Sequence, residues 1–173
     1  MAGSSTLITV APTGAEADKA AVPALPVTLA ELVVTAKECE AAGAAVIHVH
    51  IRDNAARPTL DAGRLTDTVA ALRESTGLIV QLSTGGAVTD SFASRLAVLD
   101  AAPDACSLTC GTVNFGDDVF SNPWPFVKDL YQLTRERQAS PSSSCSTWAI
   151  SLSCTGCSIS SARRPAGTCT ATW

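Results

Sequence analysis

The chain has 173 residues, enough for one ordinary domain with a hydrophobic core. Its formal net charge of −4 at pH 7, without a basic cluster, argues against a nucleic-acid partner. The apolar runs are short and interrupted, so no membrane-spanning segment is expected. The N-terminus lacks the basic start and apolar core of a signal peptide, and we therefore expect a cytoplasmic protein.

One pattern repeats through residue 138: a short apolar strand leads through a polar loop to an amphipathic helix. The expected strands cover residues 7–11, 44–50, 78–82 and 105–109. The expected helices cover residues 29–42, 61–75, about 90–101 and 123–137. The first helix has a capping box of Thr28 and Glu31, and the third is expected to be capped by Thr89 or Asp90. Apolar strands that alternate with helices indicate a parallel sheet, either doubly wound or a (β/α)8 barrel.

Polar residues follow the C-terminal end of each expected strand, where (β/α)8 barrels place their active sites. Both histidines of the chain, His48 and His50, lie at one such end. Side chains alternate along a strand, so the two imidazoles point to the same side and suit two neighbouring positions of a zinc site. Two histidines on a solvated face, or one satisfied in a core, are the alternatives. Arg52 and Asp53 are expected to form a local ion pair that orients the loop.

Four motifs of residues 6–138 resemble those of the β-keto acid cleavage enzymes, whose type member is the 3-keto-5-aminohexanoate cleavage enzyme. The motifs are Ala11-Pro12-Thr13-Gly14-Ala15-Glu16, His48-Val49-His50-Ile51-Arg52-Asp53, Gln81-Leu82-Ser83-Thr84-Gly85-Gly86 and Gly111-Thr112-Val113-Asn114-Phe115-Gly116. The resemblance implies an α/β fold of the (β/α)8 TIM-barrel family, represented here by about its first four units. It also implies a zinc-dependent reaction in which a β-keto acid and acetyl-CoA give acetoacetate and a new CoA thioester.

The resemblance also implies roles for individual residues. His48 and His50 would be two of three zinc ligands, and zinc would act as a Lewis acid on the β-keto oxygen. The expected substrate contacts are Glu16, Ser83, Gly86, Ser107 and Thr109, with the hydroxyl and N–H of residues 83–86 suited to a carboxylate. Glu16 could instead be a solvated loop acid, and residues 83–86 an ordinary strand-to-helix turn. Cys106 and Cys110 are expected to be buried thiols.

Residues 139–173 are a different kind of sequence. They contain no acid, two arginines and four of the seven cysteines, among many Ser and Thr residues. A natural linker and a metal-binding appendage around Cys154 and Cys157 are two readings, although a single CxxC pair is weak. A third reading fits better: one choice of synonymous codons for residues 139–160, read in another frame, resembles the family's next strand and helix. We therefore divide the chain into half of a barrel, 1–138, and a frameshifted, disordered tail, 139–173.

The tail leaves the family's third zinc ligand, a Glu, and its substrate-activating Arg and Asp without counterparts. We expect the intact parent to act on a small β-keto acid and acetyl-CoA, and this chain to be inactive or nearly so. The alternatives are a non-enzymatic truncated product and a metal-dependent hydrolase of another TIM-barrel class. A half barrel has open strand edges, so we expect low stability or self-association, and a homo-oligomer is compatible with this.

Overall fold

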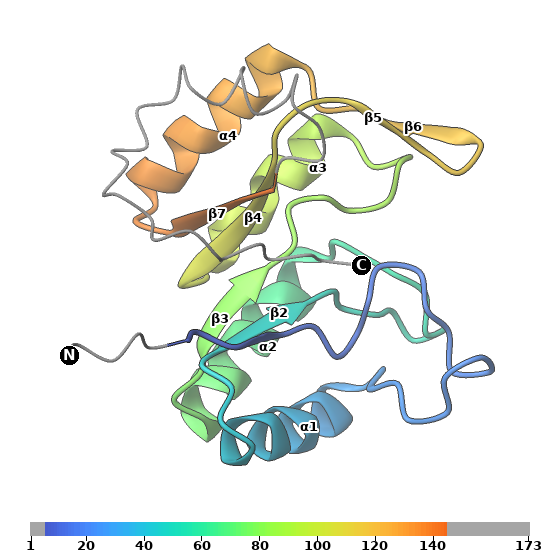
Figure 1. Ribbon diagram of the computed structural model, residues 1–173, viewed down its shortest axis with the longest axis vertical. Helices are drawn as coiled ribbons and strands as arrows, with labels where there is room; N and C mark the ends of the chain where they lie inside the picture. Colours follow the sequence, from blue (N-terminus) through green and yellow to red (C-terminus); the bar gives the residue numbers. More distant parts are fainter. Residues whose placement is uncertain (1–5, 145–173) are drawn as a thin grey trace.

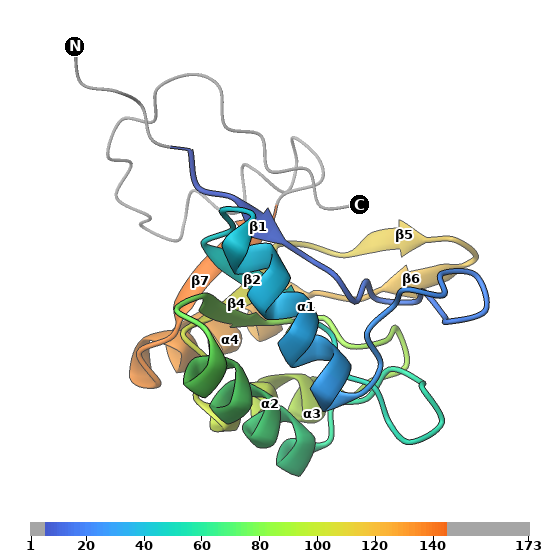
Figure 2. The same cartoon turned by 90° about the horizontal axis from the view of Figure 1, so that it is seen from below.

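The computed structural model describes residues 6–144, and these build a parallel sheet with helices on one of its faces (Figures 1 and 2). The sheet strands are β1 (Thr9–Val10), β2 (Val46–Val49), β3 (Ile79–Leu82), β4 (Ala105–Thr109) and β7 (Ser140–Ser144). The helices are α1 (Leu29–Ala41), α2 (Ala62–Ser75), α3 (Phe92–Ala97), the 3-10 turn η1 (Val98–Ala101) and α4 (Trp124–Glu136). Strands β5 (Val113–Phe115) and β6 (Asp118–Phe120) form a separate hairpin.

The order of the strands separates the two architectures that the sequence allows. Within the described residues the order is β1-β2-β3-β4-β7, and every neighbouring pair is parallel. A doubly wound sheet reverses its strand order and carries helices on both faces, whereas a barrel keeps the order of the chain and carries helices outside. The molecule is therefore a half barrel of the (β/α)8 type, as expected (Figure 2).

Alternation along the strands divides the side chains between two faces. Ile47 and Val49 of β2, with Val80 and Leu82 of β3, are at most 1% exposed and pack against α1 and α2. A second cluster joins Cys106 and Leu108 of β4 to α4. The polar residues alternate with these apolar ones along the same strands. Because the apolar side chains pack against the helices, the polar side chains point to the opposite face of the sheet.

Most helix ends agree with the sequence. Thr28 Oγ1 accepts from the N–H of Glu31, and the Glu31 carboxylate accepts from the N–H of Thr28, which confirms the capping box. The expected cap of the third helix was wrong, because Ser91 is the N-cap and Asp90 instead accepts from the N–H of Ala87. Among residues 6–144 no helix combines the length and apolar character needed to cross a membrane.

Two elements lie outside the expected pattern. The β5–β6 hairpin turns through Gly116 and Asp117, with Gly116 at φ +61°, and it extends away from the main sheet (Figure 1). Strand β7 pairs with β4 over five residues, at the start of the segment expected to be an irregular tail. Its side chains gave no strand signal, because ladder pairing uses only backbone groups. The remainder of that segment, 145–173, lies outside the described residues.

We predict that Leu72→Ala lowers the free energy of unfolding by roughly 2–5 kcal/mol, since it opens a cavity beside a fully buried side chain. Leu29→Ala is the matched control, because Leu29 is the same type of residue on a neighbouring helix but is 41% exposed. Its loss should be about 1 kcal/mol or less. Urea unfolding followed by circular dichroism measures both, and equal losses would contradict the packing described here.

Candidate functional site

The two histidines lie at the C-terminal end of β2, with their rings against each other. His48 is 8% exposed, and its Nε2 atom is 3.2 Å from Nε2 of His50. His48 is paired in register with Gln81 of β3, and its Nδ1–H donates to Gln81 Oε1 over 2.7 Å. Because Oε1 can only accept, Nδ1 carries the ring proton and the lone pair of Nε2 points towards His50.

This geometry fits two ligands of one tetrahedral metal ion. Two nitrogens at about 2.05 Å from a tetrahedral zinc ion lie roughly 3.4 Å apart, close to the separation of the two Nε2 atoms. A hydrogen bond from the outer ring nitrogen to an amide oxygen is the usual support of a metal-bound histidine. Within residues 6–144, however, no group of three or more His, Cys, Asp or Glu side chains could hold a metal. The pair supplies two ligands and needs at least one more.

Both imidazoles are held in the neutral form that metal binding requires. Burial lowers the pKa of His48, against the opposing effect of the bond to Gln81. Burial also lowers the pKa of His50 to about 3, assisted by the charges of His48 and Arg52. The solvent-poor position of the pair, more than any single charge, therefore keeps both rings unprotonated at neutral pH.

Three of the expected substrate contacts share the face of the histidines. Gln81 is paired with Ala105, so Ser83 lies level with Ser107 on the same side of the sheet. Thr109 follows two residues later on β4, again on this side. The structure thus gathers His48, His50, Ser83, Ser107 and Thr109 at one edge of one face.

The loop after β3 has groups available for an anion. Ser83 Oγ accepts from the N–H of Gly85, which leaves its own proton to donate. The N–H of Gly86 donates to no group between residues 6 and 144. Gly86 has φ +64°, and a Cβ there would lie 2.5 Å from Asp90 Oδ2, so the loop requires glycine at this position. These donors lie one strand away from the histidines.

The loop that carries Glu16 is fixed by a buried arginine. Arg52 is 4% exposed, and its Nη2 donates to the carbonyl oxygens of Thr13, Gly14 and Ala17. Burial lowers the pKa of this guanidinium, and its Nε has no hydrogen-bond partner in the described part of the chain. Glu16 itself is exposed and makes no hydrogen bond or ion pair with residues 6–144.

The expected ion pair between Arg52 and Asp53 was wrong. Asp53 pairs with Arg57 over 3.0 Å and accepts from the N–H groups of Ala55 and Arg57, so it closes its own turn. Arg52 points instead across the sheet edge to the loop after β1.

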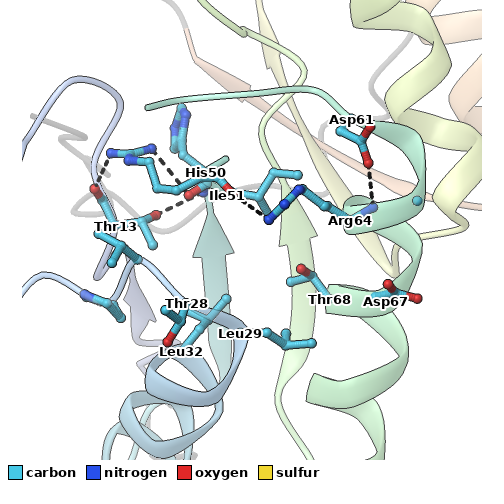
Figure 3. A pocket seen from close by; sticks show the side chains of 14 residues that line it. Thr13, Thr28, Leu29, Leu32, His50, Ile51, Asp61, Arg64, Asp67 and Thr68 are labelled. Atoms are coloured by element: carbon cyan, nitrogen blue, oxygen red, sulfur yellow. Dashed lines mark hydrogen bonds between the residues drawn. The ribbon is translucent and has the colours of Figure 1, made fainter. Parts of the chain in front are cut away.

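A cavity of about 390 Å³ opens beside this loop, between the N-terminal ends of α1 and α2 (Figure 3). His50 and Arg52 line it from the sheet, Leu32 lines it from α1, and Asp67 lines it from α2. The backbone N–H of His50 donates to Thr13 Oγ1 over 2.9 Å, and this bond connects the wall of the cavity to the pair of histidines. The cavity and the histidines therefore share one rim of the half barrel.

Sequence reasoning missed two residues of this region and anticipated two others. Gln81 lies in a recognised motif, but its role follows only from its register opposite His48. Arg95 is 3% exposed and donates to the carbonyl of Thr84 in the loop after β3, and helical spacing gave no signal for this contact. Cys106 and Cys110 are buried, as expected, and burial raises the pKa of the Cys106 thiol to about 12.

We predict that the metal-free protein loses stability as the pH falls below 6.5, because the unfolded chain then binds protons that the folded one excludes. For His50, with its pKa lowered from 6.5 to about 3, the loss between pH 8 and pH 5 is about 2 kcal/mol. His50→Asn should remove this part of the dependence. Urea unfolding of both proteins in EDTA, at pH 8 and pH 5, measures the difference, and parallel losses would refute it.

The chain is similar in sequence to a family of known proteins. The model of the beta-keto acid cleavage enzyme family matches residues 5–150. The 3-keto-5-aminohexanoate cleavage enzyme of Fusobacterium nucleatum is 38% identical over 137 residues, which cover 78% of this chain and 50% of that protein. The 3-oxoadipate:acetyl-CoA acetyltransferase of Cupriavidus necator is 35% identical over 118 residues, or 68% of this chain and 41% of that protein.

A solved structure supports the fold independently. The apo structure of ObcA superposes with a TM-score of 0.67 at 22% identity, over 78% of this chain and 33% of that one. The chain spans about half the length of the curated relatives that it matches. The family match extends over most of the chain and includes both histidines and the loop after β3, so this chain belongs to the beta-keto acid cleavage enzyme family.

Proposed function

We propose that the polar face of β2, β3 and β4 is part of an active site that transfers an acyl group between a β-keto acid and acetyl-CoA. The observation that carries this proposal is the pair His48 and His50 beside the donors of residues 83–86, in a chain of this family. A relative named as a 3-keto-5-aminohexanoate cleavage enzyme and another named as a 3-oxoadipate:acetyl-CoA acetyltransferase are 38% and 35% identical to this chain. A reaction that consumes acetyl-CoA suits a cytoplasmic protein.

In this proposal His48 and His50 hold a zinc ion and Gln81 fixes the tautomer of His48. When bound, zinc supplies a Lewis acid that polarises the β-keto oxygen. The low pKa of both imidazoles supports this role, because a neutral ring keeps its lone pair for the metal at neutral pH.

The substrate carboxylate would lie against the loop after β3. Ser83 Oγ–H and the N–H of Gly86 are donors in a turn next to the histidines, and neutral donors of this kind bind carboxylates. Ser107 and Thr109 extend the polar surface along β4. Glu16 would reach the other end of the substrate from the loop held by Arg52.

We further propose that this chain alone has little or no activity. The described residues give the histidine pair no third protein ligand, and a two-ligand site holds zinc weakly. A shifted reading frame after about residue 138 remains our explanation for the composition of 139–173. Sequencing of the coding DNA across codon 138 tests it: a base gained or lost, followed by an open frame, supports the shift, and an intact frame refutes it.

The metal proposal predicts the effect of Gln81→Leu. Loss of the bond to Nδ1 frees the His48 tautomer, so zinc affinity should fall about 10- to 100-fold. Gln132→Leu is the matched control, because Gln132 is exposed and bonds only to Glu136 on α4. Competition with a chromogenic zinc chelator measures the dissociation constants. Equal constants for the two variants would contradict the supporting role of Gln81.

The proposed reaction is tested in a chimera that joins residues 1–138 to the corresponding C-terminal half of the Fusobacterium nucleatum relative. With acetyl-CoA and 3-keto-5-aminohexanoate, the chimera should release acetoacetate, and its His48→Asn variant should not. The unmodified chain should release no more than that variant. An active His48→Asn chimera would refute the assigned metal site, and an active unmodified chain would refute the proposed inactivity.

A further inference from the structure

Arg95 of α3 is a buried cation whose hydrogen bonds go to neutral oxygen atoms. Its side chain is 3% exposed, and Nε donates to the carbonyl of Thr84 over 2.9 Å. Nη1 donates to the carbonyl of Ser121 over 2.9 Å, and Nη2 donates to Oδ1 of Asn122. Burial lowers the pKa of Arg95 to about 10, with Asp90 acting in the opposite direction, so the guanidinium stays charged at neutral pH.

Three phenylalanine rings surround this guanidinium. Its Cζ atom lies 4.4 Å from the ring centroid of Phe126, 4.8 Å from that of Phe120 and 5.8 Å from that of Phe92. The rings of Phe92 and Phe126 are stacked on each other with centroids 4.6 Å apart. Cation–π contacts and three planar hydrogen bonds fix both the position and the rotation of the side chain.

On one side, Arg95 completes a clamp on Thr84, the residue between Ser83 and Gly85. Thr84 is 1% exposed, its N–H donates to Ser107 Oγ over 3.1 Å, and its hydroxyl donates to the carbonyl of Ser107. Its carbonyl accepts from Arg95. All hydrogen-bonding groups of Thr84 are thus engaged, and the direction of the neighbouring N–H groups in residues 83–86 follows from them.

On the other side, Arg95 holds the segment that closes the β5–β6 hairpin. Asn122 is 1% exposed, its N–H donates to Thr112 Oγ1, and its Nδ2 donates to the carbonyl of Gly111. The ring of Phe120 also reaches the loop after β3, because a Cβ on Gly85 would lie 3.3 Å from Phe120 Cζ. Arg95 and Phe120 therefore form two separate links between that loop and the hairpin.

We propose that Arg95 is a positioning residue that locks the loop of residues 83–86 to the β5–β6 hairpin, so that the substrate-binding donors keep their direction only while the hairpin is docked. The part that concerns substrate rests on the proposed function. The mechanical link between loop and hairpin rests only on the contacts described above.

The planar guanidinium group of arginine is essential to this role. Arginine offers five N–H donors in fixed directions, and here three nitrogens reach acceptors on two different segments. The single ammonium of lysine cannot span acceptors on both segments while it remains among the rings. Arg95→Lys therefore keeps the charge but breaks the bridge, which separates bridging from charge alone.

The link is tested by amide hydrogen exchange in the full chain, read at Thr84 on the loop and at Asn122 at the end of the hairpin. In both Arg95→Met and Arg95→Lys, the two amides should exchange faster together, by about tenfold or more. Arg73→Met is the matched control, because Arg73 bonds to Ala102 and Asp104 at the opposite end of the sheet. Its effect should be confined to the surroundings of Asp104. If Arg95→Met does not fold, Arg95→Lys alone decides the test, and Phe120→Leu, which removes a ring in contact with both the guanidinium and the loop, should also speed exchange at the two amides.

Unchanged rates at Thr84 and Asn122 in the Arg95 variants, or wild-type rates in Arg95→Lys, would overturn the inference. The part of the inference that concerns substrate is tested by titrating acetoacetate into zinc-loaded protein and following the NMR chemical shift of the Gly86 amide. Arg95→Met should weaken acetoacetate binding at least fivefold while zinc affinity stays unchanged. If the wild type binds no acetoacetate but the exchange results hold, the link stands and the assignment of residues 83–86 to substrate binding in this chain fails.

Discussion

The register between β2 and β3 is the constraint on which the site depends. His48 is opposite Gln81, so one hydrogen bond between neighbouring strands determines which nitrogen of His48 is bare. A shift of one residue would turn Gln81 to the helix side and put Leu82 opposite His48. That shift is opposed by Ile47, Val49, Val80 and Leu82, which fill the space under α1 and α2. Packing of the apolar face thus sets the strand register, and the register determines which nitrogen of His48 is available on the polar face.

Two buried arginines organise the loops around this face in the same way. Arg52 binds three carbonyl groups of the loop after β1, and Arg95 binds the loop after β3 and the end of the hairpin. Within residues 6–144, the hydrogen bonds of both guanidinium groups end on backbone carbonyl or side-chain amide oxygens. All of these acceptors except Asn122 Oδ1 belong to the backbone, so each of those bonds fixes the path of a loop rather than the rotamer of one side chain. The loops that carry the proposed substrate contacts are held by charge from within the fold.

Sequence patterns predicted the repeating units well, because apolar periodicity and caps such as Thr28 with Glu31 are local signals. They predicted that His48 and His50 share a face for the same reason. The third helix cap was misplaced by one or two residues, since Ser91, Asp90 and Thr89 are all good cap residues and tertiary context chooses among them. The β5–β6 hairpin had a signal, a Gly-Asp pair between short apolar runs, but it lay within a motif read as loop.

The longer-range contacts could not be predicted from the sequence. Arg52 next to Asp53 reads as a local pair, yet the three acceptors of its Nη2 lie 35 to 39 residues away along the chain. Arg95 shares the short helix α3 with Phe92, but its burial also needs the rings of Phe120 from β6 and Phe126 from α4. Strand β7 consists almost entirely of serine, and its place next to β4 depends on backbone pairing.

The strand order has a consequence for the way the chain is made. Each strand of the sheet pairs with the sheet strand before it in the chain. Each described β/α unit can therefore pack onto the preceding unit as soon as it is synthesised. As synthesis proceeds from the N-terminus, β1 to β3 with α1 and α2 can close the first core cluster before α4 has left the ribosome. The histidine pair and its glutamine lie within this early part. The pair of His48 and His50 can therefore assemble before the segment after residue 138 is synthesised, whatever that segment encodes.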